Sequence, residues 1–390
     1  MTAVSFVTRE IGSLAKPPWR VKAFAGRPLE EQDVAEAERW GTRLELDGHE
    51  RLVEHLRSGE LDLGEIDDWA ARYAIRLLEK AGLDVVYDGE QRRTEMYDHV
   101  AAFAAGFEQR GTVRSFDNKY YTKAAVVERP SAPGPQDVDE LRFVQEHTDR
   151  EVKVPLTGAY TMEDWSYDEH YAGEGSLGGS AERRLDARRR FVADVAERVI
   201  RPNIAGLVAA GAEWIQIDEP AAATKPDEVP LVVSGFNAAF GGVEARKKSM
   251  HICFSDYSAL WPSVLDLEDC LELQLEFANR DSRELGTRDQ DRPGYADTLR
   301  LFREYGYPGV GLGVLDIHSD FVEPAELVRD RILYAVEILG DPERIQVNPD
   351  CGLRTRSWDV VYEKLSNMVE GTRLAETVLN RASAPVPDRI

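Results

Sequence analysis

The chain has 390 residues, of which 43% are hydrophobic and 31% are charged. These values are typical of a folded protein and exclude the apolar-poor composition of a disordered one. Lysine and arginine number 48 against 71 aspartate and glutamate residues, so the formal net charge is −23. Because this charge repels phosphate backbones and anionic lipid surfaces, we expect neither a nucleic acid nor a membrane as a partner.

The first residues and the cysteines bear on the cellular compartment. No stretch approaches the roughly 20 consecutive apolar residues of a membrane span, and Arg9 and Lys16 interrupt the start of the chain. Three cysteines, Cys253, Cys270 and Cys351, form an odd set that argues against a disulfide framework. We therefore expect a cytoplasmic protein whose cysteines either bind a metal or pack as small apolar residues.

Short apolar runs alternate with helical patterns along almost the whole chain. The helical patterns cover 185–208, 295–305, 325–339 and 358–379, and such alternation is typical of βαβ units and a parallel sheet. No G-x-G-x-x-G follows the first run, which disfavours a dinucleotide-binding fold. Eight strands predict a single (β/α)₈ TIM barrel. The expected strands are 9–12, 84–88, 152–157, 214–218, 250–254, 271–276, 311–316 and 344–348.

The remaining length is expected in three inserts within one domain that spans residues 1–390. A long helical stretch, 29–83, forms an extension after the first expected strand. A tyrosine-rich segment, 112–129, has the pattern of a β-hairpin, and 160–180 is expected to be a loop rich in glycine and aromatic residues.

Soft metal ligands follow several of the expected strands, at the barrel end where active sites lie. His251 and Cys253 are two apart in one strand, so their side chains point to the same side. Glu276 leaves the next strand and Cys351 follows the last one, and the four side chains together can hold a tetrahedral Zn²⁺. The alternative is a hydrogen-bonded barrel histidine with packing cysteines. Cys270 precedes its strand, at the opposite end, and is assigned to structure.

Other strand ends carry groups that suit an amino acid. Glu90 and Asp218 are carboxylates that can bind an ammonium group, and Ser13 offers donors for a carboxylate. Ion pairs of Glu90 with the nearby Arg92 or Arg93 are the alternative. Trp165 can stack on a planar heterocycle or anchor its loop.

A zinc ion with two thiolate ligands is better suited to hold a substrate thiol as a nucleophile than to activate water. Thiol alkylation is therefore the favoured reaction. His318, oriented by Asp316 or by a neighbour, is a candidate general acid for the leaving group, or else a solvated loop residue.

These motifs resemble the cobalamin-independent methionine synthase family, specifically its C-terminal catalytic barrel in a short single-barrel form. The resemblance extends from residue 10 to beyond 353. The matching pieces are Glu10-Ile11-Gly12-Ser13, Gly89-Glu90, Asp164-Trp165-Ser166, Ile215-Gln216-Ile217-Asp218-Glu219-Pro220-Ala221, His251-Ile252-Cys253, Glu276, Asp316-Ile317-His318-Ser319 and Val347-Asn348-Pro349-Asp350-Cys351-Gly352-Leu353.

The resemblance implies that a zinc-dependent enzyme transfers a methyl group to the thiol of homocysteine and forms methionine. His251, Cys253, Glu276 and Cys351 look like its zinc ligands. The homocysteine backbone would lie against Ser13, Glu90 and Asp218, His318 would protonate the departing amine of the donor, and Trp165 would stack on a pterin ring.

The methyl donor is the part that the resemblance leaves open. Asp88 and Asp164 stand where the family usually has His and Asn, and both changes add negative charge near the donor site. The chain also has no room for the additional N-terminal barrel of full-length members. Methyltetrahydrofolate with a polyglutamate tail is therefore disfavoured relative to a methylcorrinoid or another methyl carrier.

Two other functions remain open. One is alkyl transfer to a different thiol, of the coenzyme M type, although Glu90 and Asp218 would repel a sulfonate. The other is a non-catalytic paralogue that binds a pterin or an amino acid, for which a thiolate metal site would be unnecessary.

Overall fold

The computed structural model describes residues 3–59, 62–114, 120–172 and 181–382. Among these residues the main sheet has seven parallel strands. Their interiors are runs of buried residues, as expected where helices cover the outer face of a parallel sheet. In sheet order they are β1 (Val85–Val86), β4 (Glu151–Thr157), β6 (Trp214–Asp218), β7 (Lys247–Ile252), β8 (Cys270–Leu275), β9 (Val310–Gly313) and β10 (Ile345–Asn348).

The expected first strand, 9–12, is not a strand in the structure. Residues at its start instead make isolated parallel bridges, Thr8 to Val347 in β10 and Arg9 to Val85 in β1. Thereafter the carbonyl groups of Glu10 and Ile11 accept hydrogen bonds from the side chain of Lys153. Because these carbonyls are used by a side chain, the regular ladder ends at Arg9, although the segment still joins both edges of a strongly curved sheet.

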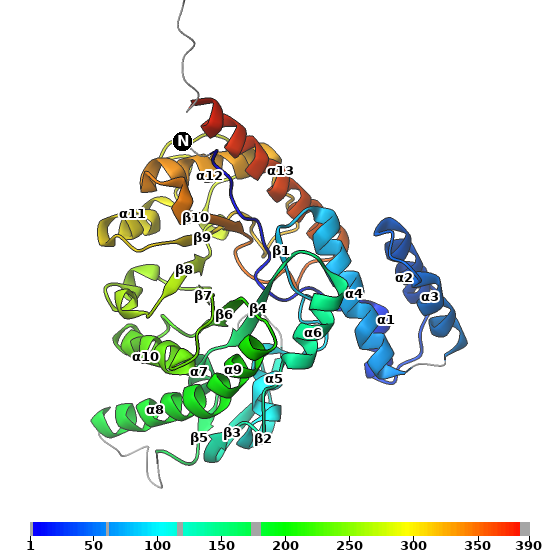
Figure 1. Cartoon of the computed structure of the whole chain (residues 1–390), viewed down its shortest axis with the longest axis horizontal. Helices are drawn as coiled ribbons and strands as arrows, with labels where there is room; N and C mark the ends of the chain where they lie inside the picture. The colour runs from blue at the N-terminus through cyan, green and yellow to red at the C-terminus, as the bar shows by residue number, and fades with distance from the viewer. Residues whose placement is uncertain (1–2, 60–61, 115–119, 173–180, 383–390) are drawn as a thin grey trace, which may run out of the picture.

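Helices surround this sheet and follow its strands in turn (Figure 1). Every segment for which the sequence predicted a helical pattern is helical, and 185–208 also contains a π-helical turn, Ala196–Ile200. The helices are α6 (Val138–His147), α8 (Ala181–Val195), α9 (Arg201–Ala209), α10 (Val229–Phe240), α11 (Ala296–Tyr305), α12 (Ala325–Leu339) and α13 (Trp358–Ala382). Short 3₁₀ turns occupy Pro226–Glu228, Tyr257–Leu260, Ser263–Asp266, Ala278–Arg280 and Pro342–Arg344.

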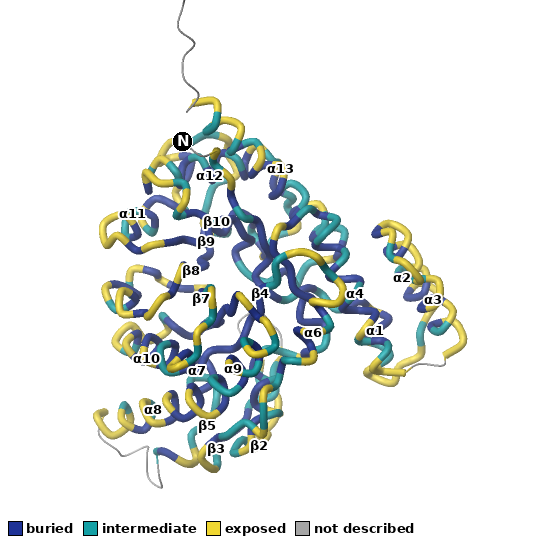
Figure 2. Tube along the Cα trace, viewed as in Figure 1, coloured by how far each residue is buried: buried dark blue, intermediate teal, exposed yellow. Residues whose placement is uncertain are grey.

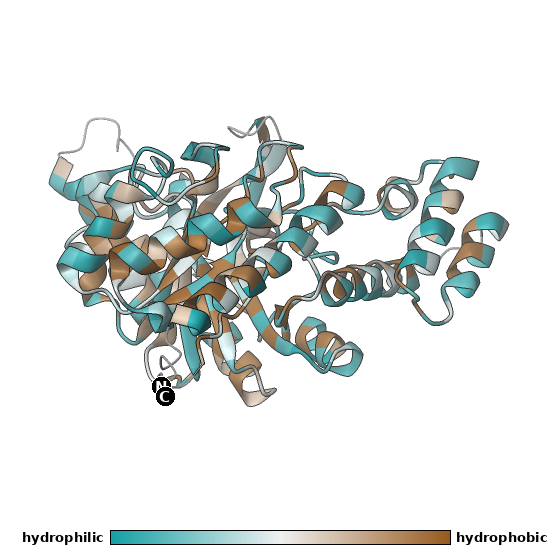
Figure 3. Cartoon of the chain, turned by 90° about the horizontal axis from the view of Figure 1, so that it is seen from above, coloured by the Kyte–Doolittle hydropathy of each residue, from teal (hydrophilic) through white to brown (hydrophobic). Residues whose placement is uncertain are grey.

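The N-terminal part contributes α1 (Pro18–Phe24), α2 (Glu31–Arg43), α3 (His49–Ser58) and α4 (Leu63–Ala81). Figures 1 and 3 show α2 and α3 standing out to one side of the sheet and its helices. Trp40 of α2 packs edge-on against Trp358 of α13, with ring centroids 5.6 Å apart. At the other end of α13, Asn380 accepts a hydrogen bond from the backbone N–H of Val4, at 2.7 Å.

A second sheet follows α5 (Met96–Phe103). Its strands β2 (Ala105–Arg114) and β3 (Tyr120–Ser131) pair antiparallel, and β5 (Tyr167–Asp168) joins β3 in parallel. A hairpin is therefore present where the sequence predicted one, and it begins before residue 112.

The expectation of a loop over 160–180 is wrong for its first part. Residues Ala159–Asp164 form the short helix α7, and 167–168 form β5, while 173–180 lie outside the described residues. The buried carboxylate of Glu219 accepts hydrogen bonds from the backbone N–H groups of Tyr160 and Thr161, at 3.1 and 2.7 Å. A carboxylate at these free N–H groups stabilises the start of a helix.

Buried residues line the sheet and the inner faces of its helices, and exposed residues lie on the outer turns (Figure 2). Among the described residues, no helix is long and apolar enough to cross a lipid bilayer.

Candidate metal and substrate site

Three of the predicted metal ligands meet at the carboxyl ends of the strands. His251 lies in β7, Cys253 follows it, and Cys351 follows β10. Their ligand atoms all lie within 4.8 Å of one another, and His251 Nε2 is 3.3 Å from Cys351 Sγ. The alternation of side chains along an extended strand brings residues 251 and 253 to the same side, as the spacing predicted.

The imidazole of His251 is held in a defined orientation. Its Nδ1 lies 3.1 Å from the backbone carbonyl of Gln274 in β8, and the side chain is buried. A carbonyl at this distance favours the tautomer with the proton on Nδ1, so Nε2 keeps its lone pair towards the two sulfurs.

Ionising both buried thiols is unfavourable unless a cation lies between them. The adjacent Cys253 thiol and burial together raise the pKa of Cys351 well above the ordinary value. One nitrogen and two sulfurs at this separation are the donor set that Zn²⁺ prefers, and a divalent cation removes the cost of ionising both thiols. The side chains therefore fit a bound zinc ion.

Glu276 lies beside this group without belonging to it. It follows β8, its side chain is buried, and Oε2 accepts hydrogen bonds from the backbone N–H of Phe254 at 3.2 Å and from Asn279 Nδ2 at 2.8 Å. Its Oε1 is buried and has no hydrogen-bond partner among the described residues. A buried carboxylate oxygen without such a partner is costly, and it is free to take a cation.

One pocket is lined by the three metal-ligand candidates and by most of the other predicted site residues. Asp316 and Glu276 do not line it. The predicted site residues that line it are Ser13, Glu90, Trp165, Asp218, His251, Cys253, His318 and Cys351.

The backbone at Glu90 is bent so that its side chain reaches the pocket. Glu90 adopts a φ of 55°, a region that non-glycine residues rarely occupy and that costs about 1–3 kcal/mol. The turn is held by Asp88, which accepts a hydrogen bond from the N–H of Glu90 at 2.8 Å, and by Lys16, which donates to its carbonyl at 2.9 Å. Gly12 leaves the space, because a Cβ there would lie 2.5 Å from Glu90 Oε1.

Asp218 ends β6 on the same side of the pocket. Gln216 Nε2 donates a hydrogen bond to its Oδ1 at 2.6 Å. Burial raises the pKa of Asp218 to about 6, against the opposing effect of His251 and with a further rise from Glu90. Two buried carboxylates that face one pocket would be stabilised by a ligand with a positive charge.

His318 lies on the loop between β9 and α12, where its Nε2 is 3.9 Å from Glu276 Oε1. The Glu276 carboxylate raises the pKa of His318. The ring also packs edge-on against Phe254, with centroids 4.7 Å apart. Asp316 does not touch the imidazole in this way: its Oδ1 accepts from the backbone N–H of His318 at 2.8 Å. Asp316 therefore acts on the loop, and Glu276 is the carboxylate beside the ring.

Aromatic residues form the outer wall of the pocket. Trp165 packs against Tyr121 of β3 with ring centroids 5.3 Å apart, and against Tyr97 at 6.2 Å. The sequence predicted Trp165, but it did not single out Tyr121, Phe254 or Arg354, which also line the pocket. The tyrosine-rich composition of the hairpin was the available signal for Tyr121.

The expected excess of negative charge at the donor site is smaller than the sequence indicates. Asp88 is fully buried, and burial together with Glu140 raises its pKa. Asp164 is paired with Arg188 at 3.0 Å and also with Lys225. Neither aspartate lines the pocket.

Comparisons with known proteins identify the family of the chain. The family model described as cobalamin-independent synthase, catalytic domain, matches residues 50–374. A methionine synthase of Thermoplasma acidophilum is 37% identical over 377 residues, which are 95% of this chain and 97% of that protein. A methionine synthase of Pyrococcus furiosus is 33% identical over 370 residues, covering 94% of this chain and 91% of the relative.

A solved structure shares the fold. The B12-independent methionine synthase from Shewanella sp. W3-18-1, in complex with selenomethionine, superposes with a TM-score of 0.72 at 22% identity, covering 96% of this chain and 99% of that one. The family model spans most of the chain, and the relatives match it nearly end to end. The chain belongs to the cobalamin-independent methionine synthase family.

Proposed function

We propose that the protein is a zinc-dependent methyltransferase that transfers a methyl group to the thiol of homocysteine and forms methionine. The observation that carries the proposal is the meeting of His251, Cys253 and Cys351 in one pocket with Glu90 and Asp218. The relatives named methionine synthase support it. A zinc ion bound here would lower the pKa of a substrate thiol and keep it as a nucleophilic thiolate.

We assign the metal to His251, Cys253, Cys351 and Glu276. The first three bring their ligand atoms together, and Glu276 offers from the next strand end its Oε1, which has no hydrogen bond among the described residues and lies 3.9 Å from His318 Nε2. Glu276 is also the ligand that a substrate thiol would most easily replace, because its other oxygen retains two hydrogen bonds.

The amino-acid end of homocysteine is assigned to the carboxylates beside the metal residues, since Asp218 pairs in register with His251 of the adjacent strand. Glu90 and Asp218 bind the ammonium group, and the backbone and hydroxyl of Ser13 bind the carboxylate. Two carboxylates select an ammonium thiol over coenzyme M, whose sulfonate they would repel.

The donor is assigned to the aromatic side. Trp165, supported by Tyr121, stacks on a planar ring, and His318 donates a proton to the leaving nitrogen as the methyl group moves to sulfur. Asp316 holds the loop of His318. A methyltetrahydrofolate-type donor fits this wall, and a methylcorrinoid or another methyl carrier is the other candidate.

We also propose that residues 1–390 form one domain in the cytoplasm. Support for one domain comes from contacts between the ends of the described chain, such as Val4 with Asn380, and from α4 packing against α13.

The first test is zinc-edge X-ray absorption of the purified protein with and without homocysteine. We expect two sulfur ligands without the amino acid, and one added sulfur with loss of one oxygen in its presence. Coenzyme M, added in place of homocysteine, should leave the spectrum unchanged. A zinc site that ignores homocysteine, or protein that binds no zinc, contradicts the proposal.

Replacement of a single cysteine tests the same assignment by a second route. The variant Cys351→Ser should lose at least about 10- to 100-fold in zinc affinity, together with turnover, because a serine hydroxyl is a poor zinc ligand. Cys270→Ser is the matched control, since Cys270 is buried at the start of β8, where its Sγ contacts the carbonyl of Glu272. Zinc content from metal analysis should fall only in the first variant.

A further inference from the structure

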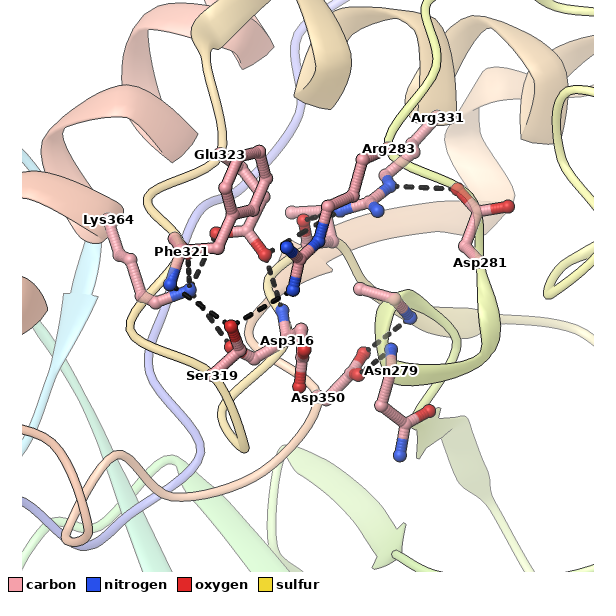
Figure 4. Close-up of polar contacts among 12 residues, drawn as sticks. Asn279, Asp281, Arg283, Asp316, Ser319, Phe321, Glu323, Arg331, Asp350 and Lys364 are labelled. Carbon is pink, nitrogen blue, oxygen red and sulfur yellow. Dashed lines mark hydrogen bonds and ion pairs between the residues drawn. The ribbon is translucent and has the colours of Figure 1, made fainter.

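A buried lysine on α13 contacts the loop that carries His318. The side chain of Lys364 has no exposed surface, and its Nζ donates to the carbonyl of Asp316 at 2.9 Å, to Glu323 Oε2 at 2.7 Å and to the carbonyl of Phe321. Figure 4 shows the lysine reaching into this loop from its helix. An ammonium group has three hydrogens, and each has an acceptor in the loop.

The contacts continue from Lys364 to the backbone of His318. Glu323, also buried, accepts a hydrogen bond from the backbone N–H of Asp316 with Oε1, at 2.8 Å. Asp316 then accepts from the N–H of His318 with Oδ1, at 2.8 Å. Three successive hydrogen bonds therefore connect the ammonium group to the backbone of the imidazole-bearing residue.

The same loop is fixed from a second side by Arg331 of α12. Arg331 donates to the carbonyl of Val314 at 2.9 Å and to Asp281 Oδ2 at 3.0 Å, and it lies 3.9 Å from Glu323. Asp281 belongs to the segment after β8 that also contains Glu276. These contacts connect the two loops whose side chains, His318 and Glu276, face each other.

Stability alone does not account for a lysine at this position. The neighbouring buried positions of α13 are apolar, among them Val361, Leu365 and Met368. Replacing a buried ion pair by apolar residues of similar volume is often neutral or stabilising. The charge at 364 is explained instead by its acceptors, since two of them are loop carbonyls that an apolar side chain would leave without this partner.

We propose that Lys364 is a positioning residue for His318. It fixes residues 316–323 so that the imidazole faces the pocket, and Glu323 is its counterion and its link to Asp316. This inference rests on the proposed role of His318 as general acid. It predicts that loss of the lysine displaces the acid without altering the metal group.

The test compares Lys364→Met with Lys247→Met. Lys247 is the control because its ion pair with Glu151 lies at the amino end of β7, away from the pocket. With methyltetrahydrofolate as donor, whose leaving amine takes a proton, K364M should lower kcat about 100-fold, the effect of misplacing a reacting group by about 1 Å. KM for homocysteine and zinc content should stay unchanged, and K247M should resemble the unaltered protein.

A double-mutant cycle separates positioning from a general loss of structure. If Lys364 acts through His318, the variant H318Q/K364M should be no slower than H318Q alone, because the group being positioned is already absent. Losses in kcat that multiply would overturn the proposal. If K364M alone does not fold, the variant K364M/E323Q removes both charges together. It is then combined with H318Q, and kcat is compared with that of H318Q alone in the same way.

Hydrogen exchange gives a measurement that needs no turnover. Amides of 314–323 should exchange at least about 10-fold faster in K364M than in K247M, since their anchoring hydrogen bonds are lost. Unchanged exchange in this segment overturns the proposal whether or not the protein transfers methyl groups. Absence of methyl transfer in the unaltered protein, with faster exchange in K364M, would instead count against the proposed function alone.

Discussion

Two adjacent carboxylates, Asp218 and Glu219, have different surroundings although both are buried. Asp218 lines the pocket, whereas Glu219 accepts hydrogen bonds from Tyr160 N–H, Thr161 N–H and Thr161 Oγ1 at the start of α7. The sequence predicted a substrate contact at Asp218. It gave no reason to expect that its neighbour holds a helix, because α7 itself was not predicted.

This difference leads to opposite expectations for two conservative substitutions. Asp218→Asn should weaken homocysteine binding about 10- to 100-fold, the effect of removing about 1.5–3 kcal/mol of a charged hydrogen bond, and leave Tm unchanged. Glu219→Gln should leave binding within about 2-fold and reduce the free energy of unfolding by about 1–3 kcal/mol, because buried donors lose an acceptor. Titration calorimetry and thermal unfolding measure the two effects. If D218N lowers Tm as well as the affinity for homocysteine, the lost affinity would reflect lost stability, and this would contradict the assignment of Asp218 as a substrate contact.

The metal group was predictable at the level of single residues because its spacing has a direct geometric meaning. Residues 251 and 253 must face the same side of a strand, and Cys351 follows another strand of the same sheet. Phe254 and Arg354 could not be predicted in this way, since they reach the pocket through loop conformations. Phe254 has a φ of 51°, a conformation that cannot be predicted from a phenylalanine in the sequence.

At the scale of elements, the hairpin of β2 and β3 forms part of the pocket wall through Tyr121. The sequence predicted the hairpin from its tyrosine-rich, two-stranded pattern, but which face of the hairpin meets the pocket depends on long-range packing. The helix α7 was missed for a related reason: the carboxylate that stabilises its start comes from a residue 58 positions away in the chain.

The contact of Tyr121 with Trp165 can be tested by the variant Tyr121→Ala. Loss of an aromatic partner worth about 0.5–1.5 kcal/mol should weaken methyltetrahydrofolate binding about 2- to 10-fold. Homocysteine affinity should not change, because the ring contacts of Tyr121 are with Trp165 and Tyr97 and not with the assigned amino-acid contacts. Calorimetric titration with each ligand separates the two effects.

Tyr305→Ala is the matched control for this variant. Tyr305 stacks on Trp261 with ring centroids 5.0 Å apart, and neither residue lines the pocket. Y305A should therefore leave both affinities unchanged. Equal losses of donor affinity in Y121A and Y305A would show that the effect comes from general destabilisation and would remove Tyr121 from the donor wall.

At the scale of the whole molecule, the expected first strand is a short segment whose residues Thr8 and Arg9 bridge the two edges of the sheet. Sequence reasoning placed this segment at the right position in the order of elements, because the motif Glu10-Ile11-Gly12-Ser13 precedes the other strand-end motifs along the chain. The sequence could not show that the carbonyls of Glu10 and Ile11 accept hydrogen bonds from Lys153 instead of pairing in a strand ladder.

Arg9 is the residue through which this segment connects distant strands. It is fully buried and donates to Gln346 and Asn348 of β10 and to Glu272 of β8, and its guanidinium lies 4.9 Å from the ring centroid of Trp214 in β6. A single side chain therefore bonds to two strands and packs on a third inside the curved sheet. Removal of one partner from such a buried ion pair leaves the other charge uncompensated.

Arg9→Leu should accordingly lower the free energy of unfolding by about 3–5 kcal/mol, while Arg246→Leu, which breaks the exposed pair with Glu213, should cost about 0–1 kcal/mol. Urea unfolding followed by circular dichroism measures both variants. Adding Glu272→Leu to R9L should recover part of the loss, because the unpaired carboxylate is then removed as well. A loss within about 1 kcal/mol for R9L, the range of a surface pair, would contradict this expectation. The curved sheet would then not depend on this side chain, and the two edges would be joined by the backbone bridges of Thr8 and Arg9 alone.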